Sequence, residues 1–276
     1  VMRGLDDLRA MGEPLAYDCE TDGRDPMTSR MRCIAFANKR LSVLIPILSI
    51  DGHTRIFQSH EETLVFGLIR EMLAHPPTRL SGQNAGQFDR LLCEQVFGVT
   101  PKLSEDTILL HLLADNEMPH GLGFLGSFYT DFPEAWKADR PAQNAQKDMD
   151  LWTYCAKDAC VTEHINAPIW AQVKARKQDH LFPRERKLQH IGACMQRIGI
   201  RVDLDAVNQR AETCLVKQQE YEQTCREIAG PAFNPRSFPQ VATQLFEKFG
   251  LAPVAYSEES GEPSTDDDSL RRMLIQ

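Results

Sequence analysis

Four carboxylates and one tyrosine, spread over three short motifs, are the residues of this chain best suited to chemistry. Asp18 and Glu20 lie in Leu-Ala-Tyr-Asp-Cys-Glu-Thr, Asp89 closes Asn-Ala-Gly-Gln-Phe-Asp, and Tyr154 and Asp158 bound Tyr-Cys-Ala-Lys-Asp. Converging carboxylates are the usual protein ligands of hard divalent cations. Two such cations, about 3.5–4 Å apart, can hold the attacking and leaving oxygens of a phosphodiester. These residue types therefore indicate metal-dependent phosphodiester chemistry, provided that folding brings them together.

The first motif falls in a segment that is typical of a β-strand. Asp18 and Glu20 are two residues apart, so on a strand both side chains point to the same face. Two carboxylates on one face repel each other unless a cation lies between them, which favours a metal site. The pattern alone is weak evidence, because Asp115 and Glu117 repeat it at a predicted helix end.

The other two motifs fall on predicted helices. Tyr154 and Asp158 are four residues apart and share one helix face, although a half-buried tyrosine above an exposed aspartate is common on any helix. Asp89 lies near the start of a helix that follows a short strand and Gly-Gln-Asn. Asn84 could hydrogen-bond a phosphate or sugar, or it could cap that helix.

The elements that must position these residues predict an α/β fold, a mixed sheet flanked by helices. Apolar runs separated by turn residues predict strands at 15–21, 31–38 and 41–47, in an antiparallel meander, and a short strand at 78–81. Apolar residues at helical spacing predict helices at 60–73, 86–97, 106–113, 122–129 and 147–166. The Pro- and Gln-rich residues 130–147 indicate a loop.

Beyond about residue 181 the sequence becomes mainly helical, so we predict a boundary near residues 175–180. A helix is expected at 182–197, a short strand at 200–203, and a long polar helix that Asp203 or Asp205 caps and that runs to about residue 229. A further helix is expected between about residues 234 and 249. The polar tail at 256–268 is predicted to be mobile.

Composition bounds the class of protein. The net charge is −8 and 42% of the residues are hydrophobic, which fits a chain with a real core. Residues 171–201 carry eight basic and two acidic side chains, and either a phosphate contact or a solvated helix face would explain them. No run of about 18 apolar residues predicts a membrane helix. The first residues contain no signal segment and read as the cut end of a longer chain.

Eight cysteines are present without any Cys-x-x-Cys pair, and several lie in apolar stretches. Free, buried thiols in a reducing compartment are the simplest interpretation. We therefore expect a location in a reducing cytosol.

The ordered set Asp-x-Glu, Asn-x-x-x-x-Asp and Tyr-x-x-x-Asp resembles the tyrosine variant of the DEDD proofreading exonucleases found in family A DNA polymerases. The stretches Ser-Glu-Asp-Thr-Ile-Leu-Leu-His, Gly-Ile-Arg-Val-Asp and Leu-Phe-Glu-Lys-Phe-Gly-Leu-Ala-Pro extend this resemblance over nearly the whole chain. It implies an RNase H-like exonuclease domain at residues 1–178. Residues 179–276 would form a helical lead-in and part of the polymerase thumb.

The resemblance also implies a mechanism and a substrate. The chain would hydrolyse single-stranded DNA or frayed primer termini from the 3′ end, with two Mg²⁺ or Mn²⁺ ions. Asp18, Glu20 and Asp158 would hold one ion and Asp18 and Asp89 the other, while the Tyr154 hydroxyl would orient the attacking water. The residues that the resemblance places against the substrate are Thr21, Gln83, Asn84 and Phe88.

Two departures from the family pattern qualify these expectations. Many relatives carry a leucine four residues after the catalytic glutamate, where it wedges against the terminal base, and this chain has Arg24 there. The polymerase palm and fingers, normally in the same chain, are not in the sequence, so it should not polymerise DNA by itself. Two alternatives stay open: an RNase D-like enzyme acting on RNA 3′ ends, and a non-catalytic module that binds primer–template.

Overall fold

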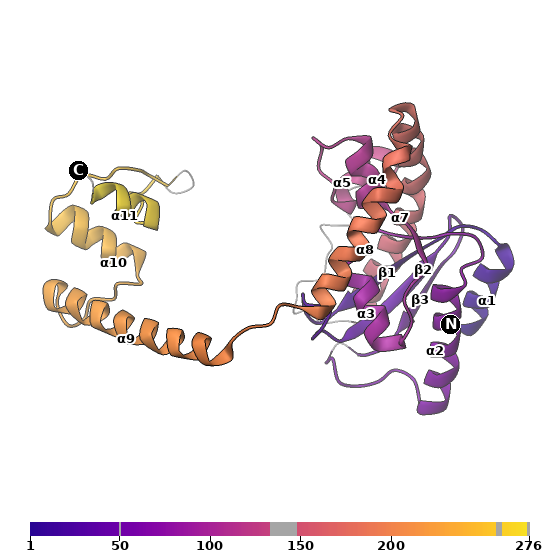
Figure 1. Cartoon of the computed structure of the whole chain (residues 1–276), viewed down its shortest axis with the longest axis horizontal. Coiled ribbons are helices and arrows are strands. Elements are labelled where there is room, and N and C mark those ends of the chain that lie inside the picture. Colours follow the sequence, from indigo (N-terminus) through magenta and orange to yellow (C-terminus); the bar gives the residue numbers. More distant parts are fainter. Residues whose placement is uncertain (50, 133–147, 258–260, 275–276) are drawn as a thin grey trace. The chain divides into compact units, whose positions relative to one another are not determined.

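The computed structural model describes residues 1–49, 51–132, 148–257 and 261–274 (Figure 1). The chain forms two compact units, Val1–Gly199 and Ile200–Gln276. The domain boundary expected at residue 178 stays a prediction, and the first compact unit runs to Gly199. It includes the basic helix α8 (Phe182–Ile198), which packs against two other helices of that unit.

A five-stranded sheet forms the centre of the first unit, and its strand order is β3-β2-β1-β4-β5. The strands β1, β2 and β3 pair antiparallel, whereas β4 pairs parallel with β1 and β5 pairs parallel with β4. The predicted meander and mixed sheet are therefore confirmed. The strands span Leu15–Thr21, Met31–Ala37, Ser42–Pro46, Leu80–Gly82 and Leu103–Asp106.

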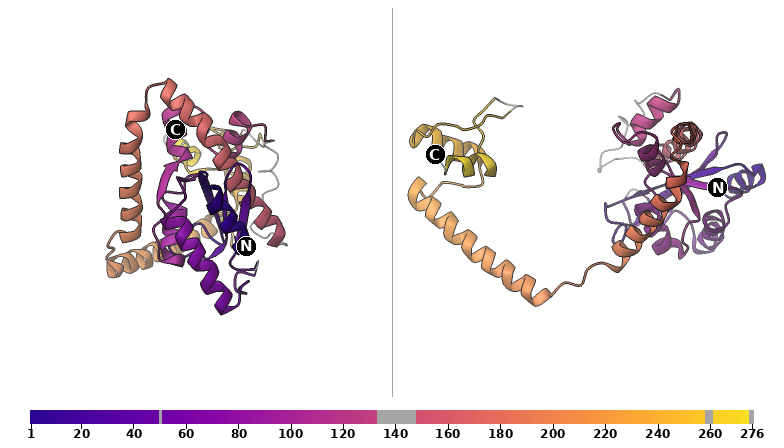
Figure 2. Two further views of the ribbon diagram at one scale, coloured as in Figure 1. Left: turned by 90° about the vertical axis from the view of Figure 1, so that its right-hand side faces the viewer. Right: turned by 45° about the horizontal axis from the view of Figure 1, so that its top comes forward.

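Helices cover both faces of the sheet, as Figures 1 and 2 show. Leu15 and Tyr17 of β1 share the main apolar core with residues of α1, α2 and α3. On the opposite face α7 packs against β1, β2 and β3, and the helices α4 and α5 pack against α7. These helices span Met2–Met11, Ser59–Ala74, Phe88–Phe97, Asp148–Ala175, Thr107–Ala114 and Leu122–Tyr129.

Two elements of this unit were not predicted. The helix α1 is mostly polar and buries only Leu5 and Leu8, so its apolar signal is short. The strand β5 has four residues, of which only Asp106 is buried, and lacks the apolar alternation by which strands are recognised. The predicted loop at 130–147 lies mostly outside the described residues.

The second unit consists of helices, as predicted, with the bounds Leu204–Ala229 for α9, Phe238–Ala242 for α10, Thr243–Lys248 for a π-helical continuation and Asp267–Met273 for α11. Asp203 caps α9, since its carboxylate accepts a 3.0 Å hydrogen bond from the Ala206 amide. The predicted strand at 200–203 does not form. Within the predicted tail, Tyr256 forms a β-bridge with Pro263, and Asp266 caps α11.

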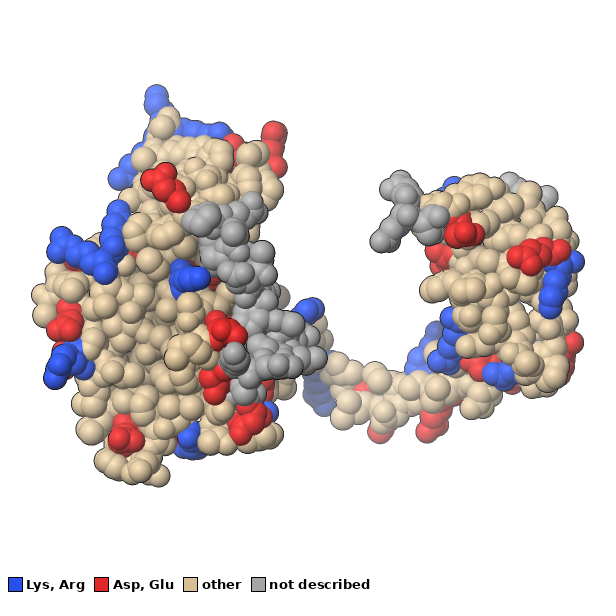
Figure 3. Space-filling model, turned by 180° about the vertical axis from the view of Figure 1, so that it is seen from behind, with Lys and Arg blue, Asp and Glu red and all other residues tan. Residues whose placement is uncertain are grey.

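Surface charge, hydropathy and the state of the cysteines can each be compared with the expectations from composition. The face in Figure 3 carries acidic and basic side chains of both signs on the first unit. Among the described residues, no helix combines the length and apolarity needed to cross a bilayer. All eight cysteines are free thiols, and Cys19, Cys33, Cys93 and Cys155 are buried, which agrees with the predicted free thiols.

Candidate metal-dependent active site

The strand β1 and the helix α7 bring three of the predicted carboxylates together. Asp18 and Glu20 point from β1 toward the sheet face that α7 covers, and Asp158 is buried on α7. One oxygen of each carboxylate lies within 4.8 Å of the others. The helix is held close here, because the Cys155 thiol lies 3.5 Å from the Asp18 carbonyl oxygen, to which it donates. Residues 140 positions apart in the chain thus form one acidic cluster.

Tyr154 lies one helical turn before Asp158 and is only 6% exposed. The spacing of four residues puts both side chains on the same side of α7, as the sequence predicts. The phenol therefore borders the acidic cluster from the helix side. It could orient a water molecule bound among the carboxylates.

Asp89 enters from the first turn of α3 and is 8% exposed. Asp89 is not part of the three-carboxylate cluster, but it interacts electrostatically with Glu20 of that cluster. Burial first, and then the negative charges of Glu20 and Asp106, together raise the pKa of Asp89 to about 8. A divalent cation would favour the ionised form of Asp89, since it would offset this repulsion.

Asp106 shapes the turn that leads to Asp89, and the sequence analysis did not single it out. The carboxylate is 1% exposed and accepts hydrogen bonds from the backbone amides of Asn84 at 2.8 Å and Gly86 at 3.0 Å. It also accepts one from the Gln189 side chain of α8 at 2.5 Å. Burial raises the pKa of Asp106, while these donors oppose the shift. The available signal was its position at the start of the helix predicted at 106–113, where an aspartate is a typical N-cap, and it does cap α4.

Asn84 does not cap α3, which corrects one of our two expectations. The N-cap residue is Gln87, and no side chain caps that helix end. Asn84 instead has a left-handed backbone with φ of 57° and an exposed side chain. Its amide nitrogen is tied to Asp106, so the side chain is presented outward from a fixed turn.

The other three residues expected at the substrate differ in how far they are engaged. Gln83 donates to the His120 carbonyl oxygen at 2.8 Å and accepts from the Thr107 hydroxyl, so both ends of its amide have partners. The Thr21 hydroxyl donates to the Gly23 carbonyl at 2.7 Å. Phe88 is half-buried against the main core. The substrate contacts of these three residues stay a prediction.

Comparison with known proteins identifies the family. The sequence profile of the family described as 3′-5′ exonuclease matches residues 5–174, which contain every carboxylate described above. This chain belongs to that family. The predicted resemblance to the exonuclease domains of family A DNA polymerases is confirmed. Exonuclease domains of this family normally use divalent metals, and the cluster of Asp18, Glu20 and Asp158 is a fitting place for one.

Individual relatives agree with this family. The DNA polymerase I of Synechocystis is 26% identical over 280 residues, covering 94% of this chain and 27% of that protein. A polymerase domain from M. smegmatis, solved with a DNA primer-template and dNTP, has a TM-score of 0.62 at 16% identity, covering 98% of this chain and 43% of that one. Escherichia coli RNase D has a TM-score of 0.52 at 16% identity, covering 68% and 47%.

The two structural matches show that the fold is shared, and the fold class predicted from the sequence is confirmed. The chain spans 20 to 30% of the length of the DNA polymerase I proteins of Bacillus subtilis, Synechocystis and Pseudomonas aeruginosa. It is thus an exonuclease domain, homologous to a part of those polymerases, together with the helical segment that follows.

Proposed function

We propose that this chain removes nucleotides from the 3′ end of single-stranded DNA with two divalent cations, as the proofreading part of a DNA polymerase. The observation that carries the proposal is the convergence of Asp18, Glu20 and Asp158 within 4.8 Å, with Asp89 buried next to them. The four carboxylates come from one strand and two helices and gather at one place in the fold. They suit a hydrolase that must neutralise a phosphodiester.

The donor set fits hard divalent cations. All the proposed ligands are carboxylates, which Mg²⁺ and Mn²⁺ prefer. Burial and, after it, repulsion from Glu20 raise the pKa of Asp89, and a bound cation would offset that repulsion. When bound, two such ions lower the pKa of water and offset the charge on the leaving oxygen.

The protein groups then have separate roles. Asp18, Glu20 and Asp158 would bind the first ion, and Asp18 with Asp89 the second. The Tyr154 hydroxyl would hydrogen-bond the attacking water and orient it toward phosphorus. Glu20 would also accept a hydrogen bond from the terminal 3′ hydroxyl. No covalent intermediate is needed.

The remaining contacts would hold the terminal nucleotide. The exposed side chain of Asn84, on its fixed left-handed turn, would donate to a phosphate or sugar oxygen. Gln83, Thr21 and Phe88 would line the same place. Arg24 is exposed in the loop after β1 and would meet the nucleotide with charge instead of an apolar wedge.

The substrate is proposed to be DNA because the similarity to DNA polymerase I extends over 94% of the chain, past the exonuclease domain itself. The rest of the polymerase and a frayed primer terminus are then the expected partners. Eight free cysteines support a reducing compartment such as the cytosol of a bacterial or phage-infected cell. An RNase D-like activity on RNA is the alternative, which the assay below includes.

A polarity assay tests the proposal. Single strands of DNA, labelled at the 5′ or the 3′ end, are incubated with the purified chain in Mg²⁺ or in EDTA, and matched RNA strands are run in parallel. We expect stepwise shortening of 5′-labelled DNA and immediate release of a mononucleotide from 3′-labelled DNA, in Mg²⁺ only. Faster cleavage of RNA than of DNA would replace the proposal with the RNase D-like alternative.

A matched pair of variants controls for contaminating nucleases. Asp18→Ala removes the shared ligand, whereas Asp115→Ala changes the same Asp-x-Glu pattern at a helix end, where the carboxylate pairs with Arg176 at 3.0 Å. We expect Asp18→Ala to be inactive and Asp115→Ala to retain activity. Equal activity of the two would refute the metal site. No cleavage by the unsubstituted chain would favour a non-catalytic binding module.

A further inference from the structure

A cleft of about 480 Å³ lies between the start of α3, the edge strand β5 and the helix α8, within the first unit. Its lining brings together five basic side chains that come from separate parts of the sequence: Arg90, Lys102, Arg186, Lys187 and His190. The only acidic residue in the lining is Asp106. The basic segment 171–201 therefore does not merely form a solvated helix face, because part of it lines a concave site.

The charge of this cleft is poorly neutralised. Lys102 and Lys187 form no ion pair within the described part of the chain. Arg186 donates to a backbone carbonyl, that of Leu103, at 2.9 Å, so it is held in place and keeps its charge. Arg90 pairs with Glu94 at 3.2 Å. Three of the four lysines and arginines are thus available to an anion.

Asp106 contributes little negative charge to the cleft surface. It is 1% exposed, and its oxygens are occupied by the amides of Asn84 and Gly86 and by the Gln189 side chain. The lining therefore does not neutralise its own basic side chains, and the matching anion would be a bound ligand.

The cleft shares a wall with the turn that precedes Asp89. Gly86 lines it, and a Cβ atom added to Gly86 would lie 2.0 Å from the Gln189 side chain carbon. Gln189 of α8 thus packs against the turn that holds Gly86, and both contact Asp106. The basic side chains of α8 in the cleft are therefore attached to the turn that leads to Asp89.

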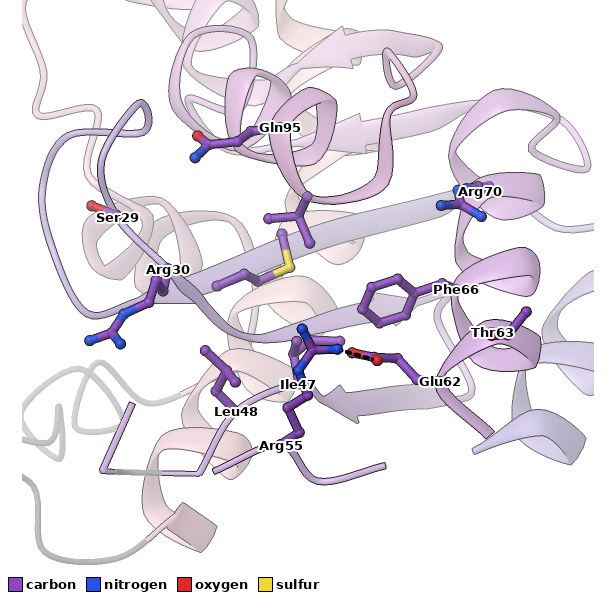
Figure 4. A pocket seen from close by; sticks show the side chains of 12 residues that line it. Ser29, Arg30, Ile47, Leu48, Arg55, Glu62, Thr63, Phe66, Arg70 and Gln95 are labelled. Carbon is purple, nitrogen blue, oxygen red and sulfur yellow. Dashed lines mark hydrogen bonds and ion pairs between the residues drawn. The ribbon is translucent and has the colours of Figure 1, made fainter. Parts of the chain in front are cut away.

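A second cavity makes a useful contrast. It measures about 530 Å³ and lies on the sheet face opposite α7, and three arginines line it (Figure 4). Two of these are paired with carboxylates, Arg30 with Asp22 at 2.7 Å and Arg55 with Glu62. Arg70 donates to the Phe97 carbonyl and keeps its charge, as Arg186 does in the cleft. Its floor is apolar, with Phe66 and Ile47. That cavity offers less uncompensated charge to an anion.

We propose that the cleft between α3, β5 and α8 binds phosphate groups of the single-stranded DNA, away from the nucleotide being removed. This inference rests on the proposed function, since it supplies a second contact for the same strand. The cleft offers cations and no Phe, Tyr or Trp among its described lining residues, so it would hold the backbone without reading the bases. It would add affinity for long strands and none for a dinucleotide.

The test uses the whole chain with Lys102→Glu and Lys187→Glu together. A double variant with the same charge change elsewhere, Lys39→Glu with Lys177→Glu, is the matched control, since both lysines are exposed. Binding of a fluorescent strand of about 12 nucleotides is measured in EDTA over a range of salt concentrations. For single strands, log K falls with log salt by about 0.7 per phosphate contact, so we expect the slope to drop by about 1.4.

Hydrolysis in Mg²⁺ supplies the second readout. We expect KM for the long strand to rise about tenfold in the cleft variant relative to the control. KM for a dinucleotide and kcat for both substrates should be unchanged.

The two proposals fail in different ways. Salt slopes and KM values that match the control would overturn the cleft assignment, and so would an equal loss on the long strand and the dinucleotide. A chain that binds DNA through the cleft lysines yet hydrolyses nothing would overturn the proposed function and leave the cleft assignment standing.

Discussion

The two units of this chain differ in what they bury. Every buried apolar side chain among the described residues lies in Val1–Gly199, including Tyr17, Phe36 and Phe97. In Ile200–Gln276 the buried side chains are polar, and large apolar ones such as Tyr221 and Phe238 are more than 60% exposed. The helix α9 buries no residue.

This difference explains where a site of like charges can exist. Holding four carboxylates close together costs free energy, because like charges repel each other. The packing of a large apolar core can offset that cost, since the net stability of a domain is small. The first unit holds Asp89 and Asp158 nearly inaccessible to water on two helices that the sheet fixes in place. The second unit has no comparable core. We therefore expect function and stability to depend on the first unit far more than on the second.

The largest expected effect is catalytic. Replacing Asp158 by alanine should lower kcat on single-stranded DNA by at least about 100-fold, the scale of losing one electrostatic stabiliser of a transition state. The same change at Asp266, the cap of α11 in the second unit, should leave kcat unchanged. Single-turnover assays in Mg²⁺ compare them. A similar loss in both variants would remove the distinction between the units.

A large structural effect is expected at Arg79, which joins β4 to α7 and β5. It pairs with Glu163 at 2.8 Å and with Glu105 at 2.6 Å, and the Glu163 side chain is 2% exposed. Arg79→Ala would leave that carboxylate buried without its partner, so the free energy of unfolding should fall by about 3 kcal/mol. Urea unfolding measures it.

The matched control for this change is Arg236→Ala in the second unit. Arg236 pairs with Glu222 at 2.9 Å but is 68% exposed, so a much smaller change is expected. Equal losses from the two substitutions would contradict the comparison.

One aspartate of each unit, Asp89 and Asp266, should respond to pH with opposite signs. In the metal-free protein Asp89 keeps its proton up to about pH 8, whereas the unfolded chain loses it near the ordinary pKa of 3.8. The folded state therefore binds more protons between these values, so the Asp89 contribution to stability falls as pH rises from 3.8 to about 8. Unfolding midpoints in EDTA should show this fall in the unsubstituted chain and a weaker one in Asp89→Asn.

Asp266 behaves in the opposite way. Hydrogen bonds from Ser269 lower the pKa of Asp266, so its contribution is present above the ordinary pKa of 3.8 and is lost as pH falls through the lowered value. Chemical-shift titration of the two aspartates separates them. A raised pKa for Asp266, or a lowered pKa for Asp89 without metal, would contradict the predicted opposite pH dependence.

The smallest effect is expected from removing residues 200–276. Since the first unit has its own core, the shortened chain should keep the melting temperature of that unit and the same affinity for Mn²⁺. Calorimetry measures both. Loss of cooperative unfolding in the shortened chain would show that the first unit depends on the second.

Much of the site could be predicted from the sequence because its signals are local. The two-residue spacing of Asp18 and Glu20 and the four-residue spacing of Tyr154 and Asp158 each fix a shared face once the element type is known. The long helix α9 was also predictable, since Asp203 precedes its polar helical pattern. In each case the deciding contact lies within a few residues of the chain.

What could not be predicted depends on contacts between distant residues. The role of Asp106 arises from a turn 20 residues earlier and from Gln189, 83 residues later. The Gln189–Asp106 bond and the Arg186–Leu103 bond both attach α8 to the sheet, so α8 belongs to the first unit, which ends at Gly199. Asn84 could cap α3 only if that helix began directly after it, but α3 begins at Phe88. The turn between Asn84 and α3 is held by Asp106, which is distant in the sequence.

The central claim is that Asp18, Glu20 and Asp158 bind a divalent cation, with Asp89 beside them for a second. Crystals soaked in Mn²⁺ and measured by anomalous diffraction test it most directly. We predict one anomalous peak among the oxygens of Asp18, Glu20 and Asp158, at about 2.1 Å from them, and a second peak next to Asp89 once nucleotide is present. Mn²⁺ bound elsewhere, with the three carboxylates free of metal at saturating concentration, would contradict the account.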